Sequence, residues 1–167
     1  MDVEVRSLLR GPGETRSFGK RLGSLLRTGD WVALTGELGS GKTTLVSAVV
    51  EHLHPGQRGR SPTYVMVEVY GESPVIVHAD LYRLDCEAEW NTLGIEDLAE
   101  QDAVVLVEWA DRAMDRMPPD RLDLSLRYSG EGAREIQIRP HGARWTGIVR
   151  GGGLDRERWS DADHPRD

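Results

Sequence analysis

The sequence predicts an α/β fold of three layers, in which helices cover both faces of a mostly parallel central sheet. Apolar runs of strand length alternate along the chain with segments of helical spacing. These runs are Trp31–Leu34, Val75–Ala79 and Ala103–Val107. Continuous apolar runs between helical segments are typical of parallel strands that are buried on both faces. A glycine-rich loop directly after the first run indicates which kind of α/β protein this is.

A short strand and a helix are expected before that loop. Residues Val3–Leu9 alternate in part between apolar and polar side chains, which favours an edge strand ending at the turn Gly11–Gly13. A helix should then begin at Glu14 and Thr15 and end near Gly29. Its apolar face would carry Phe18, Leu22, Leu25 and Leu26.

The loop Gly36–Thr44 fits the pattern G-x-x-x-x-G-K-[ST] at Gly36, Gly41, Lys42 and Thr43. Glycines let the backbone curl so that its N–H groups point inward, where they meet the positive end of the next helix. That helix is indicated by three- and four-residue spacing of Leu45, Val46, Val49, Val50 and Leu53. Strand, glycine loop and amphipathic helix in this order predict a P-loop NTPase-like fold.

Each polar residue of the loop then has an expected role toward ATP and Mg²⁺. Lys42 should reach the β- and γ-phosphates and act in catalysis, and the Thr43 hydroxyl should bind the metal. The other residues expected to contact the nucleotide are Glu37, Leu38, Gly39, Ser40, Gly41 and Thr44.

Two hydroxyl residues, Ser61 and Thr63, flank Pro62 where a polar loop enters the β-rich run Tyr64–Tyr70. The simpler interpretation is an ordinary turn in which the proline restricts the backbone. Hydroxyls that enter a strand beside a nucleotide can instead sense the γ-phosphate, as switch loops do.

Two further strands end in carboxylates, Asp80 and Glu108. Helix formers between Cys86 and Glu100, interrupted at Gly94, separate these strands. Magnesium bound to a nucleotide needs a carboxylate near the Thr43 hydroxyl, from the end of a neighbouring strand. One acid could hold the metal and the other could orient the attacking water, and the residues alone leave this assignment open.

Trp109 and Arg83 lie next to these acids in the sequence. Trp109 follows Glu108 directly, so it is either a buried tryptophan or a platform for the adenine ring. Arg83 lies three residues after Asp80 and either forms a surface ion pair or stabilises charge on the leaving phosphate.

The C-terminal part of the chain changes character. Leu122–Leu126 and Glu135–Arg139 alternate with period two and predict an antiparallel hairpin at the sheet edge, ended by Pro140. Residues 141–167 show no periodicity and are expected to form a disordered tail, despite Trp145 and Trp159. Residues 1–140 would then be one folded ATPase domain.

Composition excludes several other classes of protein. The 167 residues include a single cysteine, Cys86, which rules out an intramolecular disulfide. No apolar stretch has the length of a membrane span or the character of a signal peptide, so a cytoplasmic protein without a membrane partner is expected. The net charge is −7, with twelve acidic residues and three arginines between Asp80 and Asp120. Such a surface repels nucleic-acid phosphates, so this segment is expected to be a poor nucleic-acid site on its own.

Taken together, the motifs along the chain resemble those of one protein family. Glu14-Thr15, the Gly36–Thr44 loop, Ser61-Pro62-Thr63, His78-Ala79-Asp80-Leu81-Tyr82-Arg83, Leu93-Gly94 and Glu108-Trp109 occur in the order and approximate spacing of the TsaE (YjeE) family. The resemblance covers about residues 3 to 140. It implies the ATPase subunit of the bacterial machinery that makes threonylcarbamoyladenosine next to the tRNA anticodon, acting with TsaB and TsaD and contacting tRNA only through that complex.

The resemblance also implies roles for individual residues. Thr43 and Glu108 would bind Mg²⁺, Asp80 would be the catalytic carboxylate, and Thr15 and Trp109 would lie near the adenine. The Ser61–Thr63 segment would be a switch.

Two other functions of P-loop proteins fit the sequence less well. A small-molecule kinase has a P-loop fold of similar size but needs an arginine-bearing lid, and the core contains no arginine-rich helical insertion. A guanine-nucleotide switch needs an Asn-Lys-x-Asp stretch, which does not follow the later strands.

Overall fold

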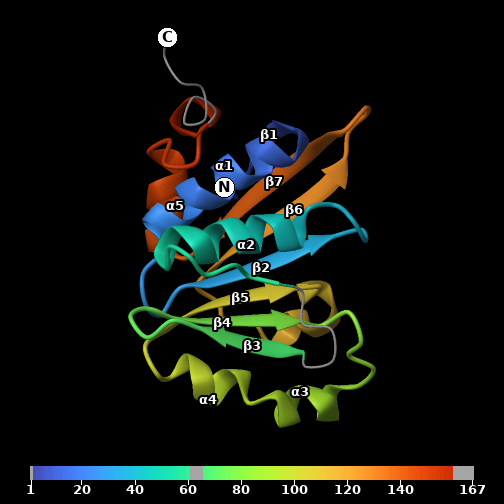
Figure 1. Cartoon of the computed structure of the whole chain (residues 1–167), viewed down its shortest axis with the longest axis vertical. Coiled ribbons are helices and arrows are strands. Elements are labelled where there is room, and N and C mark those ends of the chain that lie inside the picture. Colours follow the sequence, from blue (N-terminus) through green and yellow to red (C-terminus); the bar gives the residue numbers. More distant parts are fainter. Residues whose placement is uncertain (1, 61–65, 160–167) are drawn as a thin grey trace.

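The computed structural model describes residues 2–60 and 66–159. Helices and strands alternate through most of the chain (Figure 1). In order they are β1 (Val5–Arg10), α1 (Gly11–Leu25), β2 (Trp31–Gly36), α2 (Lys42–Leu53), β3 (Val67–Tyr70), β4 (Val75–Asp80), α3 (Glu87–Leu93), α4 (Ile95–Ala99), β5 (Ala103–Glu108), the 3₁₀ segment η1 (Ala110–Arg116), β6 (Arg121–Tyr128), β7 (Ala133–His141), α5 (Ala143–Arg150) and the 3₁₀ segment η2 (Arg156–Arg158).

Within the described residues, seven strands form one sheet in the order β1-β7-β6-β2-β5-β4-β3. In the centre of the sheet β6 pairs with β2, β2 with β5 and β5 with β4, all in parallel. The remaining pairs, β1 with β7, β6 with β7 and β3 with β4, are antiparallel. The expectation of a mostly parallel sheet is therefore correct only for the centre, where helical crossovers connect the strands.

The antiparallel hairpin is confirmed, but its place and its end differ from the prediction. β1 pairs with β7 and forms the edge outside the hairpin. β7 also continues through Pro140 to His141, although Pro140 was expected to end it. The pairing of β1 with β7 reaches only Ile138, so at Pro140 no N–H is needed on that side of the strand.

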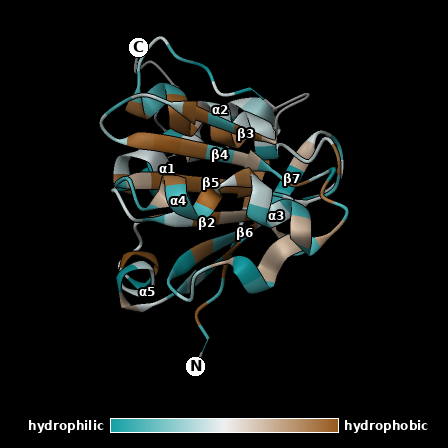
Figure 2. Ribbon diagram, turned by 90° about the horizontal axis from the view of Figure 1, so that it is seen from below, coloured by the Kyte–Doolittle hydropathy of each residue, from teal (hydrophilic) through white to brown (hydrophobic). Residues whose placement is uncertain are grey.

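Two separate cores on opposite faces of the sheet confirm the three layers. On one face α1, α2 and α5 pack over strand residues such as Leu34, Leu106 and Leu124. On the other face α3, α4 and η1 cover alternate strand residues, among them Val77 and Val105. Figure 2 shows hydrophobic residues along much of β4 and β5, which are covered on both sides as the continuous apolar runs predicted.

Helix α1 begins earlier than predicted, because Gly11–Gly13 is its first turn and not a turn before it. Pro12 is favourable at this position because N–H groups in the first turn have no partner within the helix, so the N–H that proline lacks costs no hydrogen bond. The Glu14 carboxylate accepts a hydrogen bond from the Arg10 backbone N–H at 2.6 Å. Further along, α1 crosses α2 closely at Gly19, where a Cβ would lie 2.7 Å from the Ala48 Cβ.

The prediction of a disordered tail after residue 140 is wrong for the part of the tail that is described. Helix α5 and η2 pack on the α1 side of the sheet, with Trp145 and Trp159 almost fully buried. The Trp159 ring meets Phe18 edge to face at a centroid distance of 5.7 Å. The segment has few apolar residues, but they are large, so it joins the core without showing a clear periodicity. Residues 160–167 lie outside the described residues.

No helix in ranges 2–60 and 66–159 has the length and apolar character needed to cross a membrane.

Candidate nucleotide site

The loop between β2 and α2 has the curled backbone that the glycine pattern predicts. Gly39 and Gly41 adopt φ values of +76° and +106°, where a side chain would strain the backbone. A Cβ on Gly39 would also lie 2.8 Å from the Tyr128 hydroxyl. This hydroxyl donates to the Leu38 carbonyl at 3.0 Å, so the tip of the loop rests on the end of β6. The neighbouring β7 contributes Arg134, which donates to the Gly39 carbonyl at 3.3 Å.

Lys42 is folded back into this loop and is almost fully buried. Its ammonium donates to the carbonyls of Gly36 and Glu37 at 2.7 and 2.9 Å. The ring of Trp109 lies against the same ammonium, 4.2 Å from Nζ to the ring centroid. Burial lowers the pKa of Lys42, while the nearby carboxylates, Glu108 first, oppose this shift. The charge is thus held by groups that a phosphate oxygen could replace.

Thr43, Glu108 and His78 form a chain of hydrogen bonds at the start of α2. The Thr43 hydroxyl donates to Glu108 Oε1 at 2.9 Å. The other carboxylate oxygen of Glu108, Oε2, lies 2.6 Å from His78 Nε2. An ionised carboxylate has no proton to give, so the imidazole is the donor in this contact. Glu108 and His78 are both almost fully buried, whereas Thr43 is half-buried, so the chain runs from the interior toward the loop.

Strand register brings the second carboxylate to the same place. Asp80 and Glu108 are paired residues at the ends of the parallel strands β4 and β5. Ile76 and Leu106 belong to the core beneath α1 and α2, and period-two alternation puts His78, Asp80 and Glu108 on that face as well. Asp80 Oδ1 accepts from the Tyr82 backbone N–H at 3.0 Å, which orients its carboxylate. Both predicted acids therefore lie at the strand ends that face α2.

Trp109 begins the turn after β5 in a left-handed conformation, with φ of 57°. A residue other than glycine rarely adopts this conformation, and such strain is common at binding sites. Its ring packs against that of Tyr82 at 4.9 Å, and the Arg112 guanidinium lies near both rings. An open cavity of about 800 Å³ adjoins Trp109 and the loop residues Gly36, Glu37 and Leu38.

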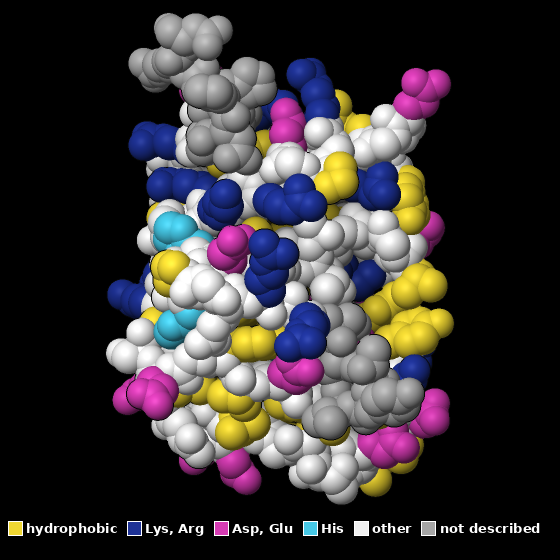
Figure 3. Space-filling view, in the orientation of Figure 1, with side chains coloured by type: hydrophobic (Ala, Val, Ile, Leu, Met, Phe, Trp, Pro, Cys, Tyr) yellow, Lys and Arg dark blue, Asp and Glu magenta, His cyan; other side chains and the backbone are white. Residues whose placement is uncertain are grey.

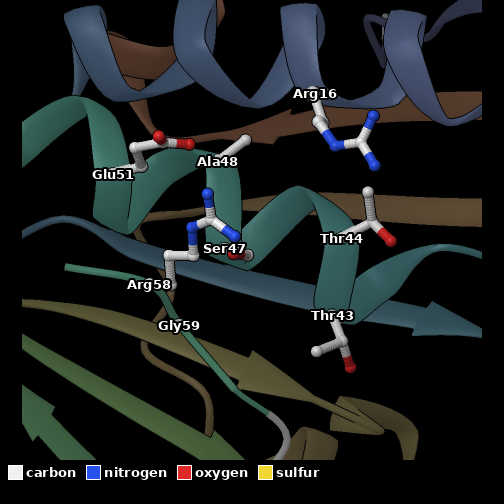
Figure 4. Close-up of a pocket in the computed structure, with 8 residues that line it drawn as sticks. All are labelled: Arg16, Thr43, Thr44, Ser47, Ala48, Glu51, Arg58 and Gly59. Atoms are coloured by element: carbon white, nitrogen blue, oxygen red, sulfur yellow. The ribbon is translucent and has the colours of Figure 1, made fainter. Parts of the chain in front are cut away.

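The other residues predicted for the site are placed less centrally. Thr15 is buried beside Gly41, and its hydroxyl donates to the Gly11 carbonyl at 3.3 Å. Arg83 is exposed in the turn after β4. Thr44 lines a different cavity, together with Arg16 of α1 (Figure 4). Ser61 and Thr63, the predicted switch residues, lie outside the described residues.

Sequence reasoning missed the parts played by three side chains. His78 is a polar residue within an apolar run, two positions before Asp80, and this alternation was a usable signal. Tyr128 and Arg134 reach the loop only because β6 lies next to β2, and nothing in their own sequence surroundings indicates this contact.

Comparisons with known proteins agree with this arrangement. The family model "Threonylcarbamoyl adenosine biosynthesis protein TsaE" matches residues 9–136. A Streptomyces coelicolor protein named tRNA threonylcarbamoyladenosine biosynthesis protein TsaE is 41% identical over 141 residues, which are 78% of this chain and 93% of that protein. The Bacillus subtilis protein of the same name is 32% identical over 135 residues, 80% of this chain and 84% of that protein.

A solved structure supports the fold as well. The crystal structure of Bacillus subtilis YdiB superposes with a TM-score of 0.78 at 26% identity. The match covers 94% of this chain and 97% of that chain. The family match spans the glycine loop, both strand-end carboxylates, β6 and the start of β7, and the chain therefore belongs to the TsaE family.

Proposed function

We propose that this chain binds ATP with Mg²⁺ on the Gly36–Thr44 loop and hydrolyses it, as the ATPase of threonylcarbamoyladenosine formation on tRNA. The observation that carries this proposal is the contact of Thr43 Oγ1 with Glu108 Oε1 at 2.9 Å. It joins the end of a glycine loop to a strand-end carboxylate, which is where P-loop proteins hold the metal of a bound nucleotide. The names of the relatives support the same pathway.

The donor set fits magnesium. Magnesium prefers oxygen ligands and in nucleotide sites is held by one or two protein groups together with phosphates and waters. Thr43 and Glu108 supply a hydroxyl and a carboxylate that already touch each other. The bound metal would neutralise charge on the β- and γ-phosphates. His78 would keep the Glu108 carboxylate oriented through its contact of 2.6 Å with Oε2.

The other side chains then act on the γ-phosphate. The Lys42 ammonium would give up its hydrogen bonds to the carbonyls of Gly36 and Glu37 and donate to phosphate oxygens instead. Charged phosphate oxygens are stronger acceptors for an ammonium than neutral carbonyls are. Asp80 would accept a hydrogen bond from the attacking water and align it with the phosphorus atom. The new P–O bond forms as the bond to the β-phosphate oxygen breaks, and ADP and phosphate leave. Arg83 would stabilise charge on the departing group.

Two further contacts and the partners remain proposals. We propose that Thr15 and Trp109 contact the nucleotide, with the indole able to stack on the adenine. Ser61 and Thr63 would sense the γ-phosphate. TsaB and TsaD would be the cytoplasmic partners, and tRNA would be reached through them, because the acidic stretch from Asp80 to Asp120 disfavours direct contact with its backbone.

Phosphate release from ATP tests the proposal, measured for the chain alone, with TsaB and TsaD added, and with magnesium chelated. The expected result is slow release that rises with the partners and stops without the metal. Lys42→Ala should weaken ATP binding roughly ten- to a hundredfold, because a charge-assisted contact contributes about 1.5–3 kcal/mol. A phosphorylated small molecule in place of free phosphate would instead identify a kinase, and unchanged ATP affinity in Lys42→Ala would reject the loop as the site.

A further inference from the structure

The tip of the glycine loop is a tight turn over residues 37–40. The Ser40 backbone N–H donates to the Glu37 carbonyl at 3.1 Å, which closes these residues as a β-turn. Gly39, at the third position of the turn, has a φ of +76°. A type II turn has a φ of about +80° at this position, whereas a type I turn has about −90°. The tip therefore has the type II form, which favours glycine at position 39.

The two turn types differ in the direction of their central peptide group, which here joins Leu38 to Gly39. This group is flipped between the two types, so its carbonyl and its N–H exchange sides. The peptide is trans, and its C=O and N–H therefore point in opposite directions. Holding the Leu38 carbonyl on one side of the loop directs the Gly39 N–H to the other side. Within residues 2–60 and 66–159, no backbone carbonyl accepts a hydrogen bond from that N–H.

Tyr128 holds the Leu38 carbonyl on the β6 side of the loop. Its hydroxyl donates to this carbonyl at 3.0 Å. Strand register brings the two residues together, because Gly36 pairs with Leu126 and each of the two residues follows two positions later. β5 lies on the other side of β2, and Trp109 at its end contacts the Lys42 ammonium. The Gly39 N–H is thus directed away from β6, toward the side on which Lys42 is held.

Arg134 of β7 supports the same contact. It is the cross-strand partner of Tyr128, and its guanidinium carbon lies 4.1 Å from the centroid of the Tyr128 ring. The guanidinium also donates to the Gly39 carbonyl at 3.3 Å. The β6–β7 hairpin therefore holds two consecutive carbonyls of the loop. A loop that is held in its binding conformation in advance loses less freedom when the ligand binds.

We propose that Tyr128 is a positioning residue for the nucleotide phosphates: its hydroxyl selects the form of the loop in which the Gly39 N–H faces the β- and γ-phosphates. In the flipped form the Leu38 carbonyl would take the place of this N–H, and its negative end would repel the phosphates. Arg134 strengthens the selection by holding the next carbonyl. The inference rests on the proposed function and adds the β6–β7 hairpin to the elements that shape the site.

Calorimetric titration of Tyr128→Phe with two probes, ADP and tripolyphosphate, tests this role in the presence of Mg²⁺. The variant loses one hydroxyl from an exposed side chain, so Tm should stay within about 2 °C of wild type. Both ligands should bind about three- to tenfold more weakly, the effect of losing one hydrogen bond. The two losses should be equal, because both ligands place phosphates on the loop.

Arg134→Gln should weaken both ligands at least about threefold. Figure 3 shows mainly lysine and arginine side chains over the area where α1 and α2 lie, so this chain also attracts anions by charge alone. Arg139→Gln is the matched control, because it removes the same charge from β7 at a residue that contacts Glu4. Its affinity for both ligands should stay within about twofold of wild type.

Nuclear magnetic resonance reports on the peptide group itself. Labelling with carbonyl-¹³C leucine and ¹⁵N glycine selects the amides of Leu-Gly peptide bonds, which the sequence contains only at Gly23, Gly39 and Gly94. ADP should shift the Gly39 amide signal strongly in wild type and much less in Tyr128→Phe. Gly23 lies inside α1 and Gly94 between α3 and α4, so their signals are internal references.

The outcomes separate this inference from the proposed function. Wild-type protein that binds neither ADP nor tripolyphosphate would reject the proposed function and this inference with it. Tight binding in wild type that stays within about twofold in Tyr128→Phe would overturn the role of Tyr128 alone. A loss limited to ADP would also overturn it, because Tyr128 lines the cavity beside Trp109 and would then contact the base directly. Equal losses with an unchanged shift of the Gly39 signal would overturn it too.

Discussion

Replacing His78 with alanine should both destabilise the fold and loosen the proposed metal site. The imidazole is fully buried, and its Nε2 lies 2.6 Å from Oε2 of the almost fully buried Glu108. A hydrogen bond to a charged group contributes about 1.5–3 kcal/mol, and its loss leaves a buried carboxylate with one partner fewer. For a chain of this size 1 kcal/mol corresponds to roughly 2–4 °C, so Tm should fall by about 3–12 °C.

Thermal unfolding followed by circular dichroism measures this change. His78→Gln is the matched variant, because its side-chain amide can donate from nearly the position of Nε2 and should recover part of the lost stability. Magnesium should also raise ADP affinity less in His78→Ala than in wild type, since Glu108 would no longer be held toward Thr43. This comparison of binding with and without the metal would not respond to a general loss of stability.

A double-mutant cycle decides whether the two side chains act together. Unfolding free energies of His78→Ala, Glu108→Gln and the double variant should show a coupling of about 1–3 kcal/mol. Effects that simply add, within about 0.5 kcal/mol, would refute the reasoning, because the imidazole would then stabilise the core independently of the carboxylate.

The remaining predictions concern the acids, Trp109 and the C-terminal segment. Glu108→Ala should weaken Mg²⁺-dependent ATP binding, whereas Asp80→Ala should preserve binding and depress turnover; the reverse pattern in titrations and phosphate-release assays would exchange their roles. ADP should change the tryptophan emission, and Trp109→Phe should lose most of that change, because the Lys42 ammonium is expected to leave the indole ring when it binds phosphate. Trp31→Phe is the control. If the response were lost in Trp31→Phe instead, the emission change would come from Trp31 on β2 and not from Trp109. Trp145→Ala should lower the unfolding free energy by about 3–5 kcal/mol, and denaturant unfolding within about 1 kcal/mol of wild type would show that α5 adds little to the core.

Local patterns in the sequence determined much of this protein. The spacing of Gly36, Gly41, Lys42 and Thr43, between an apolar run and an amphipathic helix, predicted the strand, loop and helix that the structure contains. Apolar runs ending in Asp80 and Glu108 predicted two carboxylates at neighbouring strand ends, and register confirms that they are paired. These features were readable because a strand, a turn and a helix each depend on residues that are close together in the chain.

Tertiary structure alone decided which distant residues meet. Tyr128 contacts the glycine loop because β6 pairs with β2, and the burial of Trp159 depends on Phe18 of α1, more than a hundred residues earlier. The same applies to His78, whose contact with Glu108 follows from the register of β4 on β5. Strand order and helix packing are set by the summed burial of apolar surface over the whole chain, so no local pattern encodes them.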